Sequence, residues 1–193
     1  MRSQNVFLVG LMGSGKTTVG QLLAKRTGQP FFDSDHELEQ RTGVSIATIF
    51  EIEGETAFRE REAAIIDELT QREGIVLGTG GGAIMDPANR VALQTRGIVI
   101  YLHSTAETSY ERLRRNRDRP LLMVTDPLSR LRQLYEVRHP LYVETSHHIV
   151  ESYRDRPSAV VAEILRLCTS VDLQSKNMPD PAAGVAYRAN QLD

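Results

Sequence analysis

The sequence predicts an α/β fold: a central parallel sheet of five strands covered by helices on both faces, in a three-layer α/β/α arrangement. Short apolar segments alternate with segments of helical spacing, the pattern of parallel strands joined by helical crossovers. Residues 6–9 lead through a glycine-rich loop directly into a helix. Residues 98–102 are apolar throughout, as is typical of a central strand covered on both faces.

The strands are predicted from short apolar runs. The second run ends in an acid, Asp33, and the third is interrupted by the glycine-rich residues 78–82. The predicted strands cover residues 6–9, 31–33, 75–77, 98–102 and 148–150.

The helices between these strands have ends marked by caps and breakers. Gly28 ends the first helix, because glycine readily adopts the left-handed conformation needed there. Either Ser34 or Asp35 caps the second helix, and Pro157 begins the last. Pro140 is expected to kink a long helix or to begin a new turn within it. The first predicted helix ends near residue 27. The others cover residues 35–41, 46–52, 55–72, 88–94, 106–113, 128–144 and 158–167.

The composition indicates a single soluble domain. With 193 residues, 40% of them hydrophobic, the chain can build one well-packed core. A net charge of −2 does not favour a nucleic-acid or membrane-surface partner. The single Cys168 excludes an internal disulfide, and no leader or bilayer-length apolar run is found. We therefore expect a cytoplasmic protein, and a monomer, since no exposed apolar stripe demands a partner.

The domain is expected to cover residues 1–168. Residues 169–193 are polar, contain two prolines and a glycine, and lack periodicity. This composition predicts either a mobile tail or a loosely docked extension.

The loop after the first strand predicts a nucleotide site. Its sequence, Gly10-Leu-Met-Gly-Ser-Gly-Lys-Thr17, matches G-x-x-x-x-G-K-[ST] between a strand and a helix. Such a loop turns its N–H groups towards one anion, Lys16 reaches the phosphates, and the Thr17 hydroxyl binds Mg²⁺. A glycine-rich turn without a ligand is the alternative, but the complete motif favours phosphate binding. The predicted nucleotide-binding residues are Gly13, Ser14, Gly15, Lys16, Thr17 and Thr18.

Two carboxylates follow the second strand, at the sheet edge that also carries the phosphate loop. We expect Asp33 to hold Mg²⁺ together with Thr17, and Asp35 to accept the proton of an attacking hydroxyl. Alternatively, Asp35 only caps the next helix while Asp33 is solvated in a turn. A carboxylate at the nucleophile favours transfer to an alcohol over hydrolysis, and the D-x-x-G and N-K-x-D motifs of GTPases are not found.

A third group of residues predicts a site for a small anion. Arg59 either forms ion pairs with Glu55 and Glu62 on a solvent-facing helix or grips a substrate carboxylate. Residues 80–82 are all glycine, as required where a ligand lies against the backbone, although a simple flexible turn is possible. Arg138 taken alone is typical of a surface arginine on an amphipathic helix.

In sequence order, these segments resemble the shikimate kinase family over about residues 5–167. The matching segments are G-L-M-G-S-G-K-T, F-D-S-D, E-x-x-F-R-E-R-E, G-T-G-G-G-A, R-D-R-P-L-L and Y-E-x-R-x-P-L-Y. The phosphate loop is common to many proteins, whereas its combination with the D-x-D, the F-R-x-x-E and the triple glycine is found almost exclusively in this family. The resemblance implies a P-loop kinase fold related to nucleoside-monophosphate kinases. A substrate-binding segment is implied near residues 33–62, and a lid near 112–125.

The resemblance also implies the activity, transfer of phosphate from ATP to the 3-hydroxyl of shikimate in aromatic amino-acid biosynthesis. Shikimate would be held by Asp35 at its 3-hydroxyl, by Arg59 and Arg138 at its carboxylate, and by Gly81. Lys16 and Arg119 would neutralise the transition state, and one Mg²⁺ would bridge the β- and γ-phosphates.

The arginine-dense segment at residues 112–119 has two interpretations. A nucleic-acid arm lacks support, because no aromatic residues are interleaved and Asp118 interrupts the charge. A lid that closes over a triphosphate fits better. The family pattern implies that Arg119 reaches the phosphates and that Arg112 lies over the adenine. In the adenine loop, residues 153–157, either Arg154 or Arg156 contacts the base.

Two rival functions follow from the same motifs. Gluconate kinase shares the phosphate loop and the general fold, but should lack the F-R-x-x-E and the triple glycine. The other rival is a catalytically silent nucleotide-binding module that regulates a partner. The intact set of Lys16, Thr17, Asp33, Asp35 and Arg119 argues against it.

Overall fold

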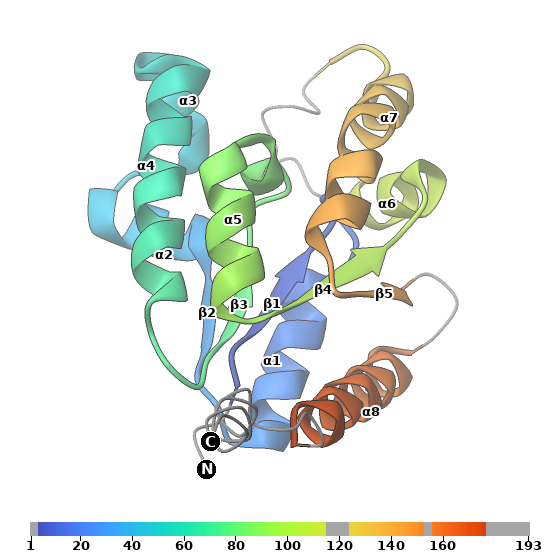
Figure 1. Cartoon of the computed structure of the whole chain (residues 1–193). Helices are drawn as coiled ribbons and strands as arrows, with labels where there is room; N and C mark the ends of the chain where they lie inside the picture. The colour runs from blue at the N-terminus through green and yellow to red at the C-terminus, as the bar shows by residue number, and fades with distance from the viewer. Residues whose placement is uncertain (1–3, 115–123, 153–155, 177–193) are drawn as a thin grey trace, which may run out of the picture.

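The computed structural model describes residues 4–114, 124–152 and 156–176, and its centre is a parallel sheet of five strands. The strand order is β2-β3-β1-β4-β5 (Figure 1). The strands are β1 (Val6–Val9), β2 (Phe31–Asp33), β3 (Val76–Gly78), β4 (Ile98–His103) and β5 (His148–Glu151). All neighbouring strands pair in parallel, so the predicted five-stranded parallel sheet is confirmed.

The helices connect the strands in the predicted order, with one addition. A short 3-10 helix, η1 (Ala83–Met85), follows the triple glycine and has no counterpart in the sequence prediction. The α-helices are α1 (Lys16–Thr27), α2 (Ser34–Thr42), α3 (Ile46–Ile52), α4 (Gly54–Thr70), α5 (Pro87–Arg96), α6 (Ala106–Leu113), α7 (Pro127–Thr145) and α8 (Pro157–Lys176).

Both faces of the sheet are covered, because the side chains of a strand alternate between them. Val6 and Leu8 of β1 belong to a buried cluster that includes residues of α1 and α8. Phe7 and Val9 belong to the cluster on the opposite face, with residues of α4, α5 and α7. The helices that pack on these two clusters form the outer layers of the predicted α/β/α arrangement, and Figure 1 shows them on either side of the sheet.

The cap of α2 differs from the prediction. Asp33 is the capping residue, and its Oδ1 accepts the N–H of Asp35 at 3.1 Å. The expectation of Ser34 or Asp35 was wrong, because both residues already lie in the helix, whereas Asp33 has the extended backbone that an N-cap needs. The Ser34 hydroxyl is instead used elsewhere, as an acceptor for the N–H of Gly80 at 2.9 Å.

The last helix is longer than predicted. It was expected to end at residue 167, but α8 continues to Lys176, since no glycine or proline interrupts the chain before Pro179. Residues 169–176 of the expected tail are therefore helical, and residues 177–193 lie outside the described residues. In α7, the helix continues from Pro127 to Thr145 with Pro140 inside it.

The carboxyl ends of three neighbouring strands carry the predicted chemistry. In the registered pairs, Gly78 at the end of β3 lies opposite Leu8 of β1 and opposite Asp33 of β2. The phosphate loop, the acidic turn and the triple glycine therefore leave the sheet side by side, at the upper end in Figure 1.

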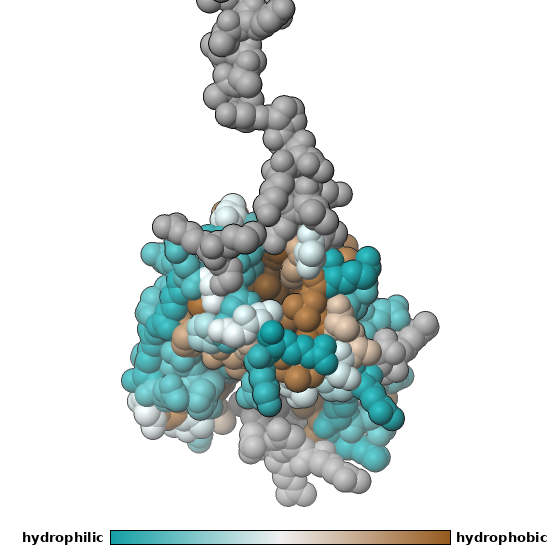
Figure 2. Space-filling model, turned by 90° about the horizontal axis from the view of Figure 1, so that it is seen from below, coloured by the Kyte–Doolittle hydropathy of each residue, from teal (hydrophilic) through white to brown (hydrophobic). Residues whose placement is uncertain are grey.

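The opposite end of the molecule has a different surface. Figure 2 looks at the lower end of Figure 1, where hydrophilic residues form much of the rim and hydrophobic ones gather towards the middle. Within the described residues, no helix is both long enough and apolar enough to cross a bilayer.

Candidate active site

The phosphate loop (residues 10–17) has the backbone of an anion cradle. Gly13 and Gly15 have φ values of 79° and 94°, in the left-handed region that favours glycine. A Cβ on Gly13 would lie 3.0 Å from the Leu113 side chain and from the Ser109 carbonyl, so α6 packs directly on the loop. Helix α1 starts at Lys16 with no side-chain cap, so its first N–H groups face the space enclosed by the loop.

The polar side chains of the loop fit a bound phosphate. The Nζ of Lys16 donates to the carbonyls of Gly10 at 2.7 Å and of Leu11 at 3.0 Å, which keeps the ammonium group over the loop. The Ser14 hydroxyl is buried and has no hydrogen-bond partner in the part of the chain that is described. A buried hydroxyl in this position is costly unless a further group, such as a phosphate oxygen, accepts from it.

Thr17 and Asp33 lie together, as the predicted magnesium site requires. The Thr17 hydroxyl donates to Asp33 Oδ2 at 2.9 Å, while Asp33 Oδ1 caps α2. A hydroxyl and a carboxylate beside the phosphate loop are the oxygen donors that Mg²⁺ prefers. These two residues therefore fit the ion, which would neutralise phosphate charge when bound.

A second cavity lies beside the phosphate loop and contains the predicted substrate residues. Asp35, Arg59, Gly81 and Arg138 all line it, together with Glu62. One wall is apolar and is made by Met12, Ile46, Phe50 and Phe58. Another wall is the glycine loop (residues 80–82), whose Gly81 would place a Cβ 3.3 Å from the backbone nitrogen of Met12 in the phosphate loop. The structure thus brings the two loops into contact.

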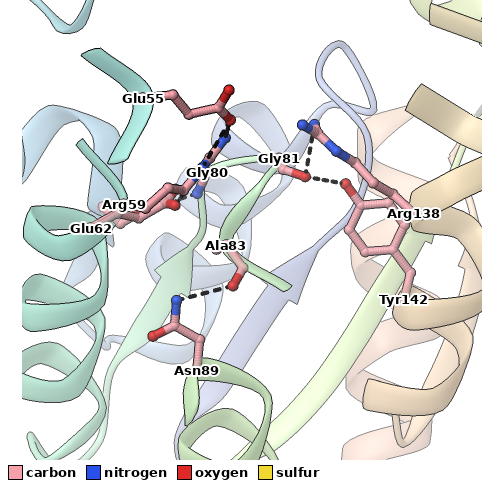
Figure 3. Close-up of polar contacts among 10 residues, drawn as sticks. Glu55, Arg59, Glu62, Gly80, Gly81, Ala83, Asn89, Arg138 and Tyr142 are labelled. Atoms are coloured by element: carbon pink, nitrogen blue, oxygen red, sulfur yellow. Dashed lines mark hydrogen bonds and ion pairs between the residues drawn. The ribbon is translucent and has the colours of Figure 1, made fainter. Parts of the chain in front are cut away.

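Arg59 is held in this cavity by two carboxylates, as Figure 3 shows. Its Nη1 donates to Glu62 Oε2 at 2.6 Å, and its Nη2 donates to Glu55 Oε1 at 3.0 Å. The guanidinium also lies 4.9 Å from the centre of the Phe58 ring. The ion pairs considered from the sequence are therefore present, but they place the arginine in a cavity instead of on a solvent-facing surface.

Glu62 is buried to an extent that the sequence did not suggest. Its side chain is 3% exposed, and Oε1 has no hydrogen-bond partner among the described residues. Burial raises the pKa of Glu62 to about 7, against the opposing effect of Arg59. A Cβ on Gly80 would overlap Glu62 Oε1 and lie 2.6 Å from Asp35 Oδ1, so the two acids face the same glycine.

Arg138 is buried, so the interpretation as a surface arginine was wrong. Only 4% of the residue is exposed, and burial lowers the pKa of its guanidinium. Its Nη1 donates to the Gly81 carbonyl at 3.2 Å. The same oxygen accepts a hydrogen bond from the Tyr142 hydroxyl at 2.5 Å. Arg138 and Arg59 therefore reach the glycine loop from opposite sides (Figure 3).

Sequence reasoning missed the residues that hold the glycine loop. The Ser34 hydroxyl accepts from Gly80, the Tyr142 hydroxyl donates to Gly81, and Asn89 Nδ2 donates to the Ala83 carbonyl at 3.0 Å. Two of these partners lie far away in the sequence, 46 residues from Ser34 and 61 from Tyr142, while Asn89 bonds only six residues back. Ser34 and Tyr142 both stood in matching segments, the first in F-D-S-D and the second at the end of Y-E-x-R-x-P-L-Y.

The predicted nucleotide residues outside the phosphate loop are only partly described. Arg112 lies against the loop, because its Nη1 donates to the Gly13 carbonyl at 3.1 Å and its Nη2 to the Ser152 carbonyl at 2.7 Å. Thr18 and Arg156 are exposed, the latter immediately before α8. Arg119, most of the lid and Arg154 lie outside the described residues.

A phosphate loop at the end of a parallel sheet, in contact with a cavity that holds two arginines and two acids, defines a P-loop kinase of a small molecule. A family model described as shikimate kinase matches residues 12–169. The chain therefore belongs to the shikimate kinase family, and the resemblance noted in the sequence is confirmed.

Individual relatives agree with this assignment. A shikimate kinase of Burkholderia thailandensis is 53% identical over 161 residues, which cover 83% of this chain and 88% of the relative. The solved structure of shikimate kinase from Acinetobacter baumannii in complex with shikimate has a TM-score of 0.86 and 47% identity. It covers 89% of this chain and 96% of that structure.

A gluconokinase from Sinorhizobium meliloti has a TM-score of 0.52 at 20% identity, with 89% of this chain and 97% of the other covered. This likeness concerns the fold alone, as expected of the rival considered from the sequence.

Proposed function

We propose that this protein transfers the γ-phosphoryl group of ATP to the 3-hydroxyl of shikimate, giving shikimate 3-phosphate and ADP in aromatic amino-acid biosynthesis. One observation carries the proposal: the cavity with Asp35, Arg59 and Arg138 directly adjoins the phosphate loop, sharing Met12 with it. An acceptor alcohol in the cavity would thus lie next to the terminal phosphate. Two arginines suit a carboxylate, and the apolar wall suits the ring of a small molecule.

The phosphate loop would bind the nucleotide through its backbone. The N–H groups at the start of α1 and the Ser14 hydroxyl would donate to phosphate oxygens, and the Lys16 ammonium would neutralise charge that develops during transfer. Thr17 and Asp33 would hold one Mg²⁺, which supplies charge neutralisation to the β- and γ-phosphates. Arg112 would lie at the base, with Arg119 and Arg156 as further nucleotide contacts.

Asp35 would act on the acceptor. Its carboxylate faces the cavity beside the glycine loop, where it would accept a hydrogen bond from the 3-hydroxyl and receive its proton as the new O–P bond forms. Arg59 and Arg138 would hold the substrate carboxylate at the other end of the molecule. This division fixes the orientation of the ring, so that a single hydroxyl is presented for transfer.

The proposal also includes the functional segments of the chain, its oligomeric state and its compartment. Residues 33–62 would form the substrate-binding segment of one kinase domain that ends near residue 168, and residues 112–125 would form the lid. We further propose a monomeric enzyme of the cytoplasm. The single half-buried Cys168 and the nearly balanced charge are consistent with that compartment.

The deciding experiment is ADP release by the purified protein with ATP and Mg²⁺ against shikimate, gluconate or no acceptor. Release with shikimate alone is expected. Release with gluconate would replace the substrate assignment. Absence of release with every acceptor, despite measurable ATP binding, would indicate a silent nucleotide-binding module.

A further inference from the structure

We propose that Tyr142 is a positioning residue for the substrate. Its hydroxyl fixes the orientation of the peptide between Gly81 and Gly82. Through that peptide it fixes the positions of Arg59 and Arg138 in the cavity. The inference rests on the proposed acceptor site and adds a residue that does not itself line the cavity.

The hydrogen bond from Tyr142 has a buried donor and a shared acceptor. Tyr142 is fully buried in α7, and its hydroxyl lies 2.5 Å from the Gly81 carbonyl oxygen. Burial raises the pKa of the phenol, so the group remains a donor. Arg138, one helical turn earlier on the same face of α7, donates to the same oxygen. One helix thus supplies both donors to this carbonyl (Figure 3).

Fixing this carbonyl also fixes the next N–H group. In a trans peptide, the C=O of Gly81 and the N–H of Gly82 point in opposite directions. Because the carbonyl points to α7, the N–H of Gly82 is directed away from α7. Among the described residues, no hydrogen bond recorded for the glycine loop uses the N–H of Gly81 or Gly82. These donors are therefore available to a ligand.

The loop needs such a restraint because of its composition. Three consecutive glycines can rotate their peptides at little steric cost. The guanidinium of Arg59 lies against Gly82, in the space that a Cβ would fill. Rotation of the peptide would therefore displace the backbone of Gly82 against which this guanidinium packs. Tyr142 thus acts on Arg59 through Gly82, and on Arg138 through the shared carbonyl.

Tyr142 also keeps the carbonyl paired when Arg138 binds substrate. If the guanidinium turned from Gly81 towards a carboxylate, a buried oxygen without another donor would lose its only hydrogen bond, which is unfavourable. The Tyr142 hydroxyl remains in place and removes this cost.

The test is Tyr142→Phe, which deletes only the hydroxyl. We expect the KM for shikimate to rise by about tenfold, the equivalent of one lost buried hydrogen bond, while the KM for ATP changes by less than about twofold. Tyr101→Phe is the matched control. Tyr101 stacks on Tyr142 with ring centres 4.9 Å apart, but its hydroxyl bonds to His139 Nδ1 at 3.0 Å and not to Gly81.

A second comparison separates positioning from general loosening. Discrimination between shikimate and its neutral carboxamide should fall in Y142F and stay unchanged in Y101F, because only the first change alters the support of the arginines. Equal effects of both variants on the shikimate KM, or unchanged discrimination in Y142F, would overturn the proposal.

The wild-type protein provides a test that does not depend on a folded variant. The backbone amide resonance of Gly82 should shift on addition of shikimate and remain in place on addition of a non-hydrolysable ATP analogue. A resonance that does not respond to shikimate would contradict the inference.

Discussion

The guanidinium of Arg59 occupies the space in which a side chain on Gly82 would have to lie. Its Nη2 is 2.5 Å from the position of an ideal Cβ, well inside any real contact. Gly82 has φ −100° and ψ −7°, which alanine adopts readily. The glycine is therefore required here by the neighbouring arginine and not by the backbone conformation.

Gly82→Ala should consequently displace Arg59 without straining the loop. We expect the KM for shikimate to rise by about tenfold or more, because charge-assisted hydrogen bonds to a carboxylate contribute about 1.5–3 kcal/mol. Steady-state kinetics with each substrate varied would measure this. Gly78→Ala is the control, since its Cβ would meet Phe31 at an ordinary distance of 3.4 Å. Similar shikimate KM values for both variants would contradict the prediction.

Asp35→Asn should separate binding from chemistry. The amide keeps the size of the side chain but cannot receive the hydroxyl proton, so kcat should fall by about a hundredfold or more. The Kd for ATP, measured by equilibrium titration, should stay within about twofold, since Asp35 lines the acceptor cavity. Unchanged turnover would rule out Asp35 as the base and leave it only an orienting role.

Thr17→Val should weaken the use of magnesium. Valine keeps the branched shape of threonine but removes the oxygen that lies 2.9 Å from Asp33 Oδ2. We expect the Mg²⁺ concentration for half-maximal activity to rise by about tenfold, as is common when a ligand shell is disturbed. Thr27→Val is the control, because that hydroxyl bonds to the Leu23 carbonyl at the far end of α1. An unchanged Mg²⁺ requirement in the Thr17 variant would exclude the proposed metal site.

Glu62 should make the stability depend on pH. Its pKa is raised to about 7 by burial, against a reference value of 4.5. Between these values the folded protein binds more protons than the unfolded chain, so the contribution of Glu62 to the free energy of unfolding is lost as the pH rises towards 7. Urea denaturation between about pH 5 and pH 8 should show a steeper decline for the wild type than for Glu62→Gln.

Glu163→Gln is the matched control for this experiment. Glu163 is half-exposed and pairs with Arg166, which lowers its pKa, so its contribution changes only at more acidic pH. The pH dependence of this variant should match that of the wild type. A wild-type slope that survives in Glu62→Gln would show that another group causes it.

The features that could be predicted from the sequence are those with a local cause. Gly28 ends α1 because the residue must adopt a positive φ, which is 73° in the structure. The alternation in β1 and the apolar run of β4 follow from which faces are buried. Likewise, Asp35, Arg59, Gly81 and Arg138 line one cavity, as their matching segments implied. Their catalytic roles remain predictions.

The features that could not be predicted depend on distant partners or on a choice between near-equal residues. Asp33, Ser34 and Asp35 are all residue types that can cap a helix. Asp33 caps α2 because, as the last residue of β2, it has the extended backbone that an N-cap needs. Glu62 is spaced like a surface ion-pair partner, and only packing against Gly80 shows its burial. In the sequence, Tyr142 resembles any aromatic residue of the core. Only the structure shows that its hydroxyl donates to the carbonyl of Gly81, 61 residues away.

The position of β1 at the centre of the sheet has a consequence for synthesis. Although β1 is the first strand in the sequence, its two partners are β3, which begins at Val76, and β4, which begins at Ile98. This fully buried strand therefore has no neighbour until β3, at Val76–Gly78, has been synthesised. Such distant pairing slows folding, and it leaves Val6–Val9 in need of shielding from other chains during translation.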